Sequence, residues 1–111
     1  MHEKMIKVYI ASPYTSGYMA ENVKTQIDAY SALMDIGFAP YSPVLTHFVE
    51  IAKPRPYWMW MKICLEYVTA CDCVLRLGGD SPGATMEVDL ATELGKRVFY
   101  SIEELNKFWN E

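Results

Sequence analysis

The sequence has no apolar run long enough to cross a membrane, and basic residues are few. No hydrophobic segment approaches the ~20 consecutive apolar residues that a membrane helix needs. With 10 Lys and Arg against 14 Asp and Glu, the net charge is -4 and the pI is about 5.1. A protein that binds a nucleic-acid polymer would need a basic stripe to displace counterions. Membrane and nucleic-acid partners are therefore disfavoured, but a small phosphorylated ligand is not, because backbone amides bind phosphate without a net positive charge.

Cysteine is scarce as well: the chain has only Cys64, Cys71 and Cys73. An odd number of cysteines, with no export signal in the opening segment Met1–Met5, predicts reduced thiols in the cytoplasm. A zinc site completed by His47 is the weaker alternative, because Cys71 and Cys73 lack the usual two-residue gap between zinc ligands. Buried apolar thiols are favoured, and we expect neither a metal nor another cofactor.

Internal repeats, low-complexity tracts and linkers are also absent. The length of 111 residues suits one domain that spans residues 1–111. A content of 51% hydrophobic and 14% aromatic residues predicts a folded chain rather than a disordered one. Since so small a domain buries only a modest fraction of its surface, the aromatic excess favours a homo-oligomer, most simply a dimer.

Apolar patterning and turn residues predict strands and helices in strict alternation. The predicted strands are Val8–Ala11, Phe38–Tyr41, Asp72–Leu77 and Arg97–Tyr100. The predicted helices are Met19–Ile36, Trp58–Ala70, Pro82–Leu94 and Ser101–Trp109, and residues 44–56 are predicted as a loop with about one helical turn. This order indicates an α/β fold: a doubly wound parallel sheet of about four strands, flavodoxin-like or Rossmann-like, with helices on both faces.

Two loops rich in small residues follow the central strands of this sheet. In such folds ligands bind outside the carboxyl ends of the strands, where the strand order reverses, so Ser12–Gly17 and Gly78–Gly83 should meet at the site. Ser81 and Pro82 are typical of a helix start, and the N–H groups of that first turn favour an anion. Taken alone, the pattern favours a purely structural role for Ser81 as a helix cap.

Glu87 changes this balance. It lies one helical turn after Gly83 on the same face, and the tilt of helical Cβ atoms aims its carboxylate back toward the ligand position. We expect the helix dipole to keep it ionised, as a nucleophile or an electrostatic stabiliser must be. A solvated surface glutamate is the alternative, and it is the expected reading for Glu93 and Glu103.

Three segments together resemble a known family. They are Val8–Tyr14 (VYIASPY), Gly37–Pro43 (GFAPYSP) and Ser81–Glu87 (SPGATME). In this order the sequence resembles the nucleoside 2-deoxyribosyltransferase-like superfamily, in particular its small, often phage-borne members, over most of its length.

The resemblance implies cleavage or exchange of an N-glycosidic bond in a nucleoside or nucleotide. Glu87 would attack the anomeric carbon, Tyr9 would orient Glu87, and Ser81 would contact a 5′-phosphate. From the residues alone, Tyr9 is better explained as a core tyrosine of its strand. The expected substrate-binding residues are Ser12, Pro13, Tyr14, His47, Cys64, Ser81 and Gly83.

The sequence departs from the family pattern at two positions. Cys64 stands where the resemblance implies a second acid that serves the departing base, and a thiol with a pKa near ~8.5 is a poor acid. Thr15 or a neighbour stands where nucleotide-cleaving members carry an arginine. His47 is a candidate contact to base or sugar, although a lone loop histidine is more often structural. The segment Tyr57–Met61 is interpreted as core and oligomer contact, with a base-stacking wall as the alternative.

Two functions from different classes follow. The first is an enzyme that hydrolyses the N-glycosidic bond or transfers the (deoxy)ribosyl group, and it is favoured by Tyr9, Ser81 and Glu87. The second is a nucleotide-binding sensor or regulatory module without turnover, and it is favoured by Cys64. A flavin-binding protein is disfavoured, because the usual Ser/Thr-rich phosphate loop does not follow the first strand. The enzyme is the preferred hypothesis.

Overall fold

The computed structural model describes residues 4–110, so the first three residues of the opening segment Met1–Met5 lie outside the described part of the chain. The strands are β1 (Lys7–Ala11), β2 (Ala39–Tyr41), β3 (Cys73–Arg76) and β4 (Arg97–Phe99). The helices are α1 (Met19–Asp35), the 3-10 turn η1 (Pro43–Thr46), α2 (His47–Ala52), α3 (Tyr57–Ala70), α4 (Pro82–Glu93) and α5 (Ile102–Asn110). Within the described residues, no helix has the length and the apolar content needed to span a membrane.

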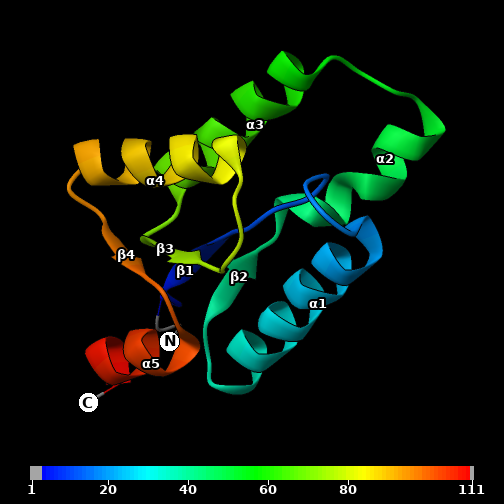
Figure 1. The fold of residues 1–111 in the computed structure, drawn as a ribbon. Helices are drawn as coiled ribbons and strands as arrows, with labels where there is room; N and C mark the ends of the chain where they lie inside the picture. The colour runs from blue at the N-terminus through cyan, green and yellow to red at the C-terminus, as the bar shows by residue number, and fades with distance from the viewer. Residues whose placement is uncertain (1–3, 111) are drawn as a thin grey trace.

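The four strands form one parallel sheet in the order β2-β1-β3-β4. Helices α1 and α5 cover one face, and α3 and α4 cover the other (Figure 1). This arrangement confirms the predicted flavodoxin-like, doubly wound sheet. The strand order reverses between β1 and β3, so the loops that follow these two strands meet at one end of the sheet.

Side chains of β1 alternate between two cores, as a strand buried on both faces requires. Val8 and Ile10 pack under α1 and α5, whereas Tyr9 and Ala11 pack under α3 and α4. All four are fully buried. Tyr9 is therefore a core residue of its strand, and it faces the helix that carries Glu87.

Residues 43–52 differ from the expectation of a loop with about one helical turn. The structure has two short helical pieces there, η1 and α2, which lie between α1 and α3 and project away from the sheet (Figure 1). No residue of α2 is buried and no side chain caps it. The sequence therefore carries neither of the two signals, an apolar face packed on a core or a capping residue, that mark a helix.

Candidate active site

A cavity of about 830 Å³ opens at the carboxyl ends of β1 and β3. The loop after β1, the loop before α4, and the segment from η1 to α3 enclose it. The predicted site residues that line it are Ser12, Tyr14, His47, Cys64, Ser81, Gly83 and Glu87. The fold thus brings seven of the nine candidate residues to one cavity.

Glu87 forms a buried pair with Tyr9 at the wall of this cavity. The Tyr9 hydroxyl donates a hydrogen bond to Oε2 of Glu87, whose residue is only 5% exposed. Tyr9 itself does not line the cavity but lies behind the carboxylate. Burial first, and then the carboxylate charge, raise the pKa of Tyr9 far above its usual range, so the phenol stays a proton donor. The pair fixes the direction in which Glu87 faces the cavity.

Burial raises the pKa of Glu87 from 4.5 to about 7. The hydrogen bond from Tyr9, the charge of Arg76 and the Cys64 thiol each lower that pKa, but desolvation outweighs them. The expectation that the helix dipole keeps this carboxylate fully ionised was therefore wrong. Near neutral pH the group divides between its ionised and protonated forms, and only the ionised form can act as a nucleophile.

Cys64 lies close to both members of the pair. Burial is the main cause of a raised pKa for this thiol. The thiol is therefore protonated at neutral pH, and the position where the resemblance implies an acid carries a group that gives up its proton reluctantly.

Ser81 caps α4, as its position before Pro82 predicts. Its hydroxyl oxygen accepts a hydrogen bond of 3.1 Å from the Ala84 amide, and its carbonyl accepts one from the Thr85 amide. Pro82 has no N–H. The Gly83 amide, which has no hydrogen-bond acceptor among residues 4–110, is thus the free backbone donor of this first turn, and Gly83 lines the cavity.

Pro13 lies outside the cavity lining, unlike its neighbours Ser12 and Tyr14. It is buried, and its ring packs on Gly79, where a Cβ would stand 2.8 Å from the proline Cγ. Gly79 has a φ of +103°, which side chains other than glycine rarely adopt. This contact holds together the two loops that follow β1 and β3, so its effect on the site is indirect.

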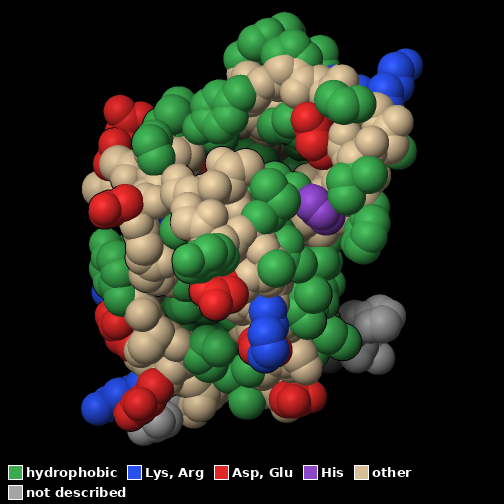
Figure 2. Space-filling view, turned by 45° about the vertical axis from the view of Figure 1, so that its right-hand side comes forward, with side chains coloured by type: hydrophobic (Ala, Val, Ile, Leu, Met, Phe, Trp, Pro, Cys, Tyr) green, Lys and Arg blue, Asp and Glu red, His purple; other side chains and the backbone are tan. Residues whose placement is uncertain are grey.

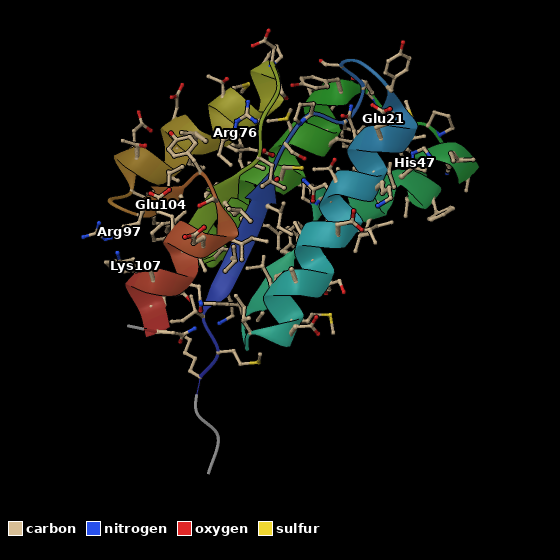
Figure 3. The ribbon with its side chains drawn as sticks, turned by 60° about the horizontal axis from the view of Figure 1, so that its bottom comes forward. Glu21, His47, Arg76, Arg97, Glu104 and Lys107 are labelled. Atoms are coloured by element: carbon tan, nitrogen blue, oxygen red, sulfur yellow. The ribbon has the colours of Figure 1, made fainter. Side chains whose placement is uncertain are left out.

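Arg76 stabilises the loop that follows β3. It lies on the opposite side of this end of the sheet from His47. Its guanidinium donates to the carbonyl oxygens of Leu77 and Gly79, the latter at 2.6 Å. Figure 3 shows Arg76 on the side of β3 and α4, whereas His47 projects from α2 beside the first turns of α1. Arg76 acts on Glu87 through its charge and does not line the cavity.

Gln26 is a buried polar residue that the sequence reading did not single out. Its amide nitrogen donates to the Ile10 carbonyl at 3.0 Å and to the Ser12 hydroxyl at 2.7 Å, and its amide oxygen accepts from Ser42 at 2.5 Å. It thereby ties the loop after β1 to the strand end of β2. A glutamine within the apolar stripe of α1 was the available signal.

The outer wall of the cavity comes from α2 and the start of α3. The Tyr14 hydroxyl is hydrogen-bonded to Nδ1 of His47, and Oε2 of Glu50 accepts a hydrogen bond of 2.5 Å from the Trp60 indole. Burial and the charge of Glu50 raise the pKa of Tyr14, which places this carboxylate close to the Tyr14–His47 pair. Glu50 is a cavity residue that the sequence did not indicate, whereas Trp60 belongs to the segment for which a base-stacking wall was the alternative.

The segment Tyr57–Met61 was predicted to be core and oligomer contact, and the core part of this prediction holds only for Met61. Only Met61 is buried, and Tyr57, Trp58 and Met59 are exposed. Tyr57 and Trp60 line the cavity, together with Met61. The first turns of α3 extend beyond the sheet, so the core under them ends before the helix does.

The three cysteines are free. Cys71 and Cys73 are buried in the two different cores, with pKa values raised to about 11 and about 12, chiefly by burial. Within residues 4–110, no group of three or more His, Cys, Asp or Glu side chains is placed to hold a metal ion.

A comparison with solved structures shows that this parallel sheet and its covering helices have a nucleoside 2-deoxyribosyltransferase-like fold. The structure is similar to that of a 2-deoxyribosyltransferase from the psychrotolerant bacterium Bacillus psychrosaccharolyticus, with a TM-score of 0.61 and 25% sequence identity. The match covers 86% of this chain and 75% of the enzyme.

Within this class, residues 6–100 match the family described as a domain of unknown function, DUF4406, and the chain belongs to that family. A comparison with curated proteins gives no match.

Proposed function

We propose that this protein cleaves or exchanges the N-glycosidic bond of a (deoxy)nucleoside or (deoxy)nucleotide, with Glu87 as the nucleophile. The observation that carries the proposal is the buried Tyr9–Glu87 pair at the wall of a cavity large enough for such a ligand. The structural similarity to a 2-deoxyribosyltransferase supports a glycosyl-transfer chemistry in general terms.

In the proposed first step, an oxygen of ionised Glu87 forms a bond to C1′ while the bond from C1′ to the base nitrogen breaks. Tyr9 holds the other oxygen and keeps the carboxylate aimed at the sugar. The electron pair of the broken bond leaves with the base, which takes up a proton. Water or a second base then attacks C1′ and releases Glu87.

The departing base would lie beside the protonated Cys64 thiol, which is close to Glu87. Because a thiol is a weak acid with a raised pKa here, it assists this departure less than a carboxylic acid would. We therefore expect the best substrates to carry bases that leave easily. The same feature supports the second candidate, a sensor that binds nucleotides without turnover.

The remaining cavity residues would bind the substrate. Ser12, Tyr14 and His47 form one wall and are proposed to contact sugar or base. Ser81 and the free amide of Gly83 are proposed to face a 5′-phosphate.

The test is incubation of the protein with each common nucleoside and deoxynucleoside, and with the matching 5′-monophosphates. Chromatography would detect released free base, and addition of a second base would distinguish transfer from hydrolysis. We expect base release from at least one substrate. If ligands stabilise the protein against heat but no base appears, the sensor function replaces the enzyme.

We also propose that two copies of the chain associate through the apolar surface of α2 and α3. Hydrophobic side chains gather over this part of the molecule (Figure 2), and they include Phe48, Ile51, Trp58 and Ile63, each at least 41% exposed. An exposed patch of this kind marks an interaction surface more often than a solvated one.

The substitution Trp58→Lys is expected to convert a dimer into a monomer of 12.7 kDa in analytical ultracentrifugation, because it places a charge in the buried centre of the interface. Tyr100→Lys is the matched control, since Tyr100 is 63% exposed and Trp58 is 62% exposed, but Tyr100 lies next to β4 instead. A wild-type protein that sediments as a monomer would contradict the proposal.

A further inference from the structure

The cavity contains one cationic side chain that no other described group neutralises. Arg55 is half-buried and is the only Lys or Arg among the described residues that line the cavity. Its guanidinium forms neither an ion pair nor a hydrogen bond with the described part of the protein. Partial burial of an unpaired guanidinium is unfavourable unless something else binds it.

Glu50 accepts a hydrogen bond from the backbone amide of Arg55 but forms no ion pair with its guanidinium. Oε2 of Glu50 accepts a hydrogen bond of 3.1 Å from the Arg55 amide and one of 2.5 Å from the Trp60 indole. The carboxylate therefore fastens the connection between α2 and α3 to both helices. The hydrogen bond to the Arg55 amide holds the backbone of this residue in place. The same carboxylate forms no salt bridge with the Arg55 guanidinium.

The residues of α3 that line the cavity form a stripe along the helix, which runs from the end near Arg55 toward Glu87. Cys64 lies beside Glu87 at one end of this stripe, and Tyr57 lies at the other end, seven residues or about 10 Å away along the helix. The Tyr57 hydroxyl lies against Gly83, where a Cβ would be only 3.0 Å from it. Arg55 precedes Tyr57 by two residues, so its backbone lies beyond the end of α3 that is remote from Cys64.

We propose that Arg55 binds the phosphate of a 5′-phosphorylated nucleoside whose glycosidic bond lies at Glu87. A guanidinium suits this role because its fork of donors matches phosphate oxygens. The Tyr57 hydroxyl and the Gly83 amide are further donors in the lining of the same cavity. The assignment rests on the proposed function for the position of the glycosidic bond, and it makes the substrate a nucleotide and not a nucleoside.

The experiment measures affinity by calorimetry in the Glu87→Gln background, in which the ligand is not consumed. The probes are deoxyadenosine, deoxyguanosine, deoxycytidine and thymidine, with their 5′-mono-, di- and triphosphates, and inorganic pyrophosphate. We expect phosphorylated ligands to bind roughly 10- to 100-fold more tightly than the matching nucleosides, as a charge-assisted hydrogen bond gives. Arg55→Met should remove most of this difference and leave nucleoside affinity unchanged, and Arg55→Lys should keep a larger part of it.

Lys53→Met is the matched control, since it removes the same charge from the same segment at an exposed position outside the cavity. It should change nucleotide affinity little, and circular dichroism of each variant would verify folding. The proposal is overturned if nucleosides and nucleotides bind equally, if neither nucleotides nor pyrophosphate bind, or if both Met variants lose the same affinity.

The two proposals fail separately. Base release by the wild-type protein tests the proposed reaction. The effect of Arg55→Met on nucleotide affinity tests the phosphate contact, and this second test remains valid even if no base is released. A longer phosphate chain that binds more tightly in the wild type, but not in Arg55→Met, would place the contact beyond the first phosphate.

Discussion

Glu87→Gln is expected to lower base release by roughly 10³-fold or more while ligand affinity changes little. The amide has the shape of the carboxylate and can still accept the hydrogen bond from Tyr9, but it cannot form the bond to C1′. Since that bond develops only in the transition state, its loss reduces turnover and not ground-state binding. Chromatographic base release and calorimetric binding would measure the two effects separately.

Glu93→Gln is the matched control for this experiment. Glu93 ends the same helix α4 and is exposed, so its substitution should change turnover by less than the error of the assay and stability by no more than about 0.5 kcal/mol. A Glu87→Gln variant that releases base at the wild-type rate would exclude Glu87 as the nucleophile, whatever the two variants bind.

The central part of the fold could be predicted because its local signals agree with one another. Ser81 and Pro82 mark the start of α4, and Gly95 follows its end with a φ of +73°. Val8–Ala11 and Cys73–Arg76 are continuous apolar runs of the kind that parallel strands buried on both faces require. Once these elements are placed, the alternation of strands and helices and the right-handed crossover rule leave few topologies.

The outer wall of the cavity could not be predicted, because no core specifies it. Helix α2 has no buried residue, and Glu50 is positioned by partners five and ten residues later in the chain. The contact between Tyr57 and Gly83 joins residues far apart in sequence and leaves no pattern in either segment. Arg55 therefore looks like an ordinary loop arginine until the cavity is known.

The protonation of Glu87 was predicted wrongly for a related reason. The dipole of α4 depends on local position and can be inferred from sequence, whereas desolvation depends on how β1, α3 and α4 close around the side chain. Desolvation is the larger effect here, and it raises the pKa of Glu87 to about 7.

This raised pKa predicts that the folded protein loses stability as pH rises from about 4.5 to about 7. In that interval Glu87 is ionised in the unfolded chain but retains its proton in the folded one, so unfolding releases a proton and becomes more favourable at higher pH. A pKa raised from 4.5 to about 7 corresponds to a loss of at most about 3 kcal/mol in the free energy of unfolding. Glu87→Gln, which cannot ionise, should lack this contribution.

Urea unfolding of the wild type and of Glu87→Gln at a series of pH values between 4 and 8 would isolate the contribution, because all other titrating groups are common to both proteins. The two stabilities should lie close together at pH 4, and the variant should become the more stable protein above pH 7. Glu93→Gln should follow the wild type throughout. Turnover should move in the opposite direction and rise through pH 7, since only ionised Glu87 attacks the sugar. Parallel stability curves for the wild type and Glu87→Gln would mean that folding leaves the pKa of Glu87 near its ordinary value, and a rise in turnover through pH 7 would then have to come from another group.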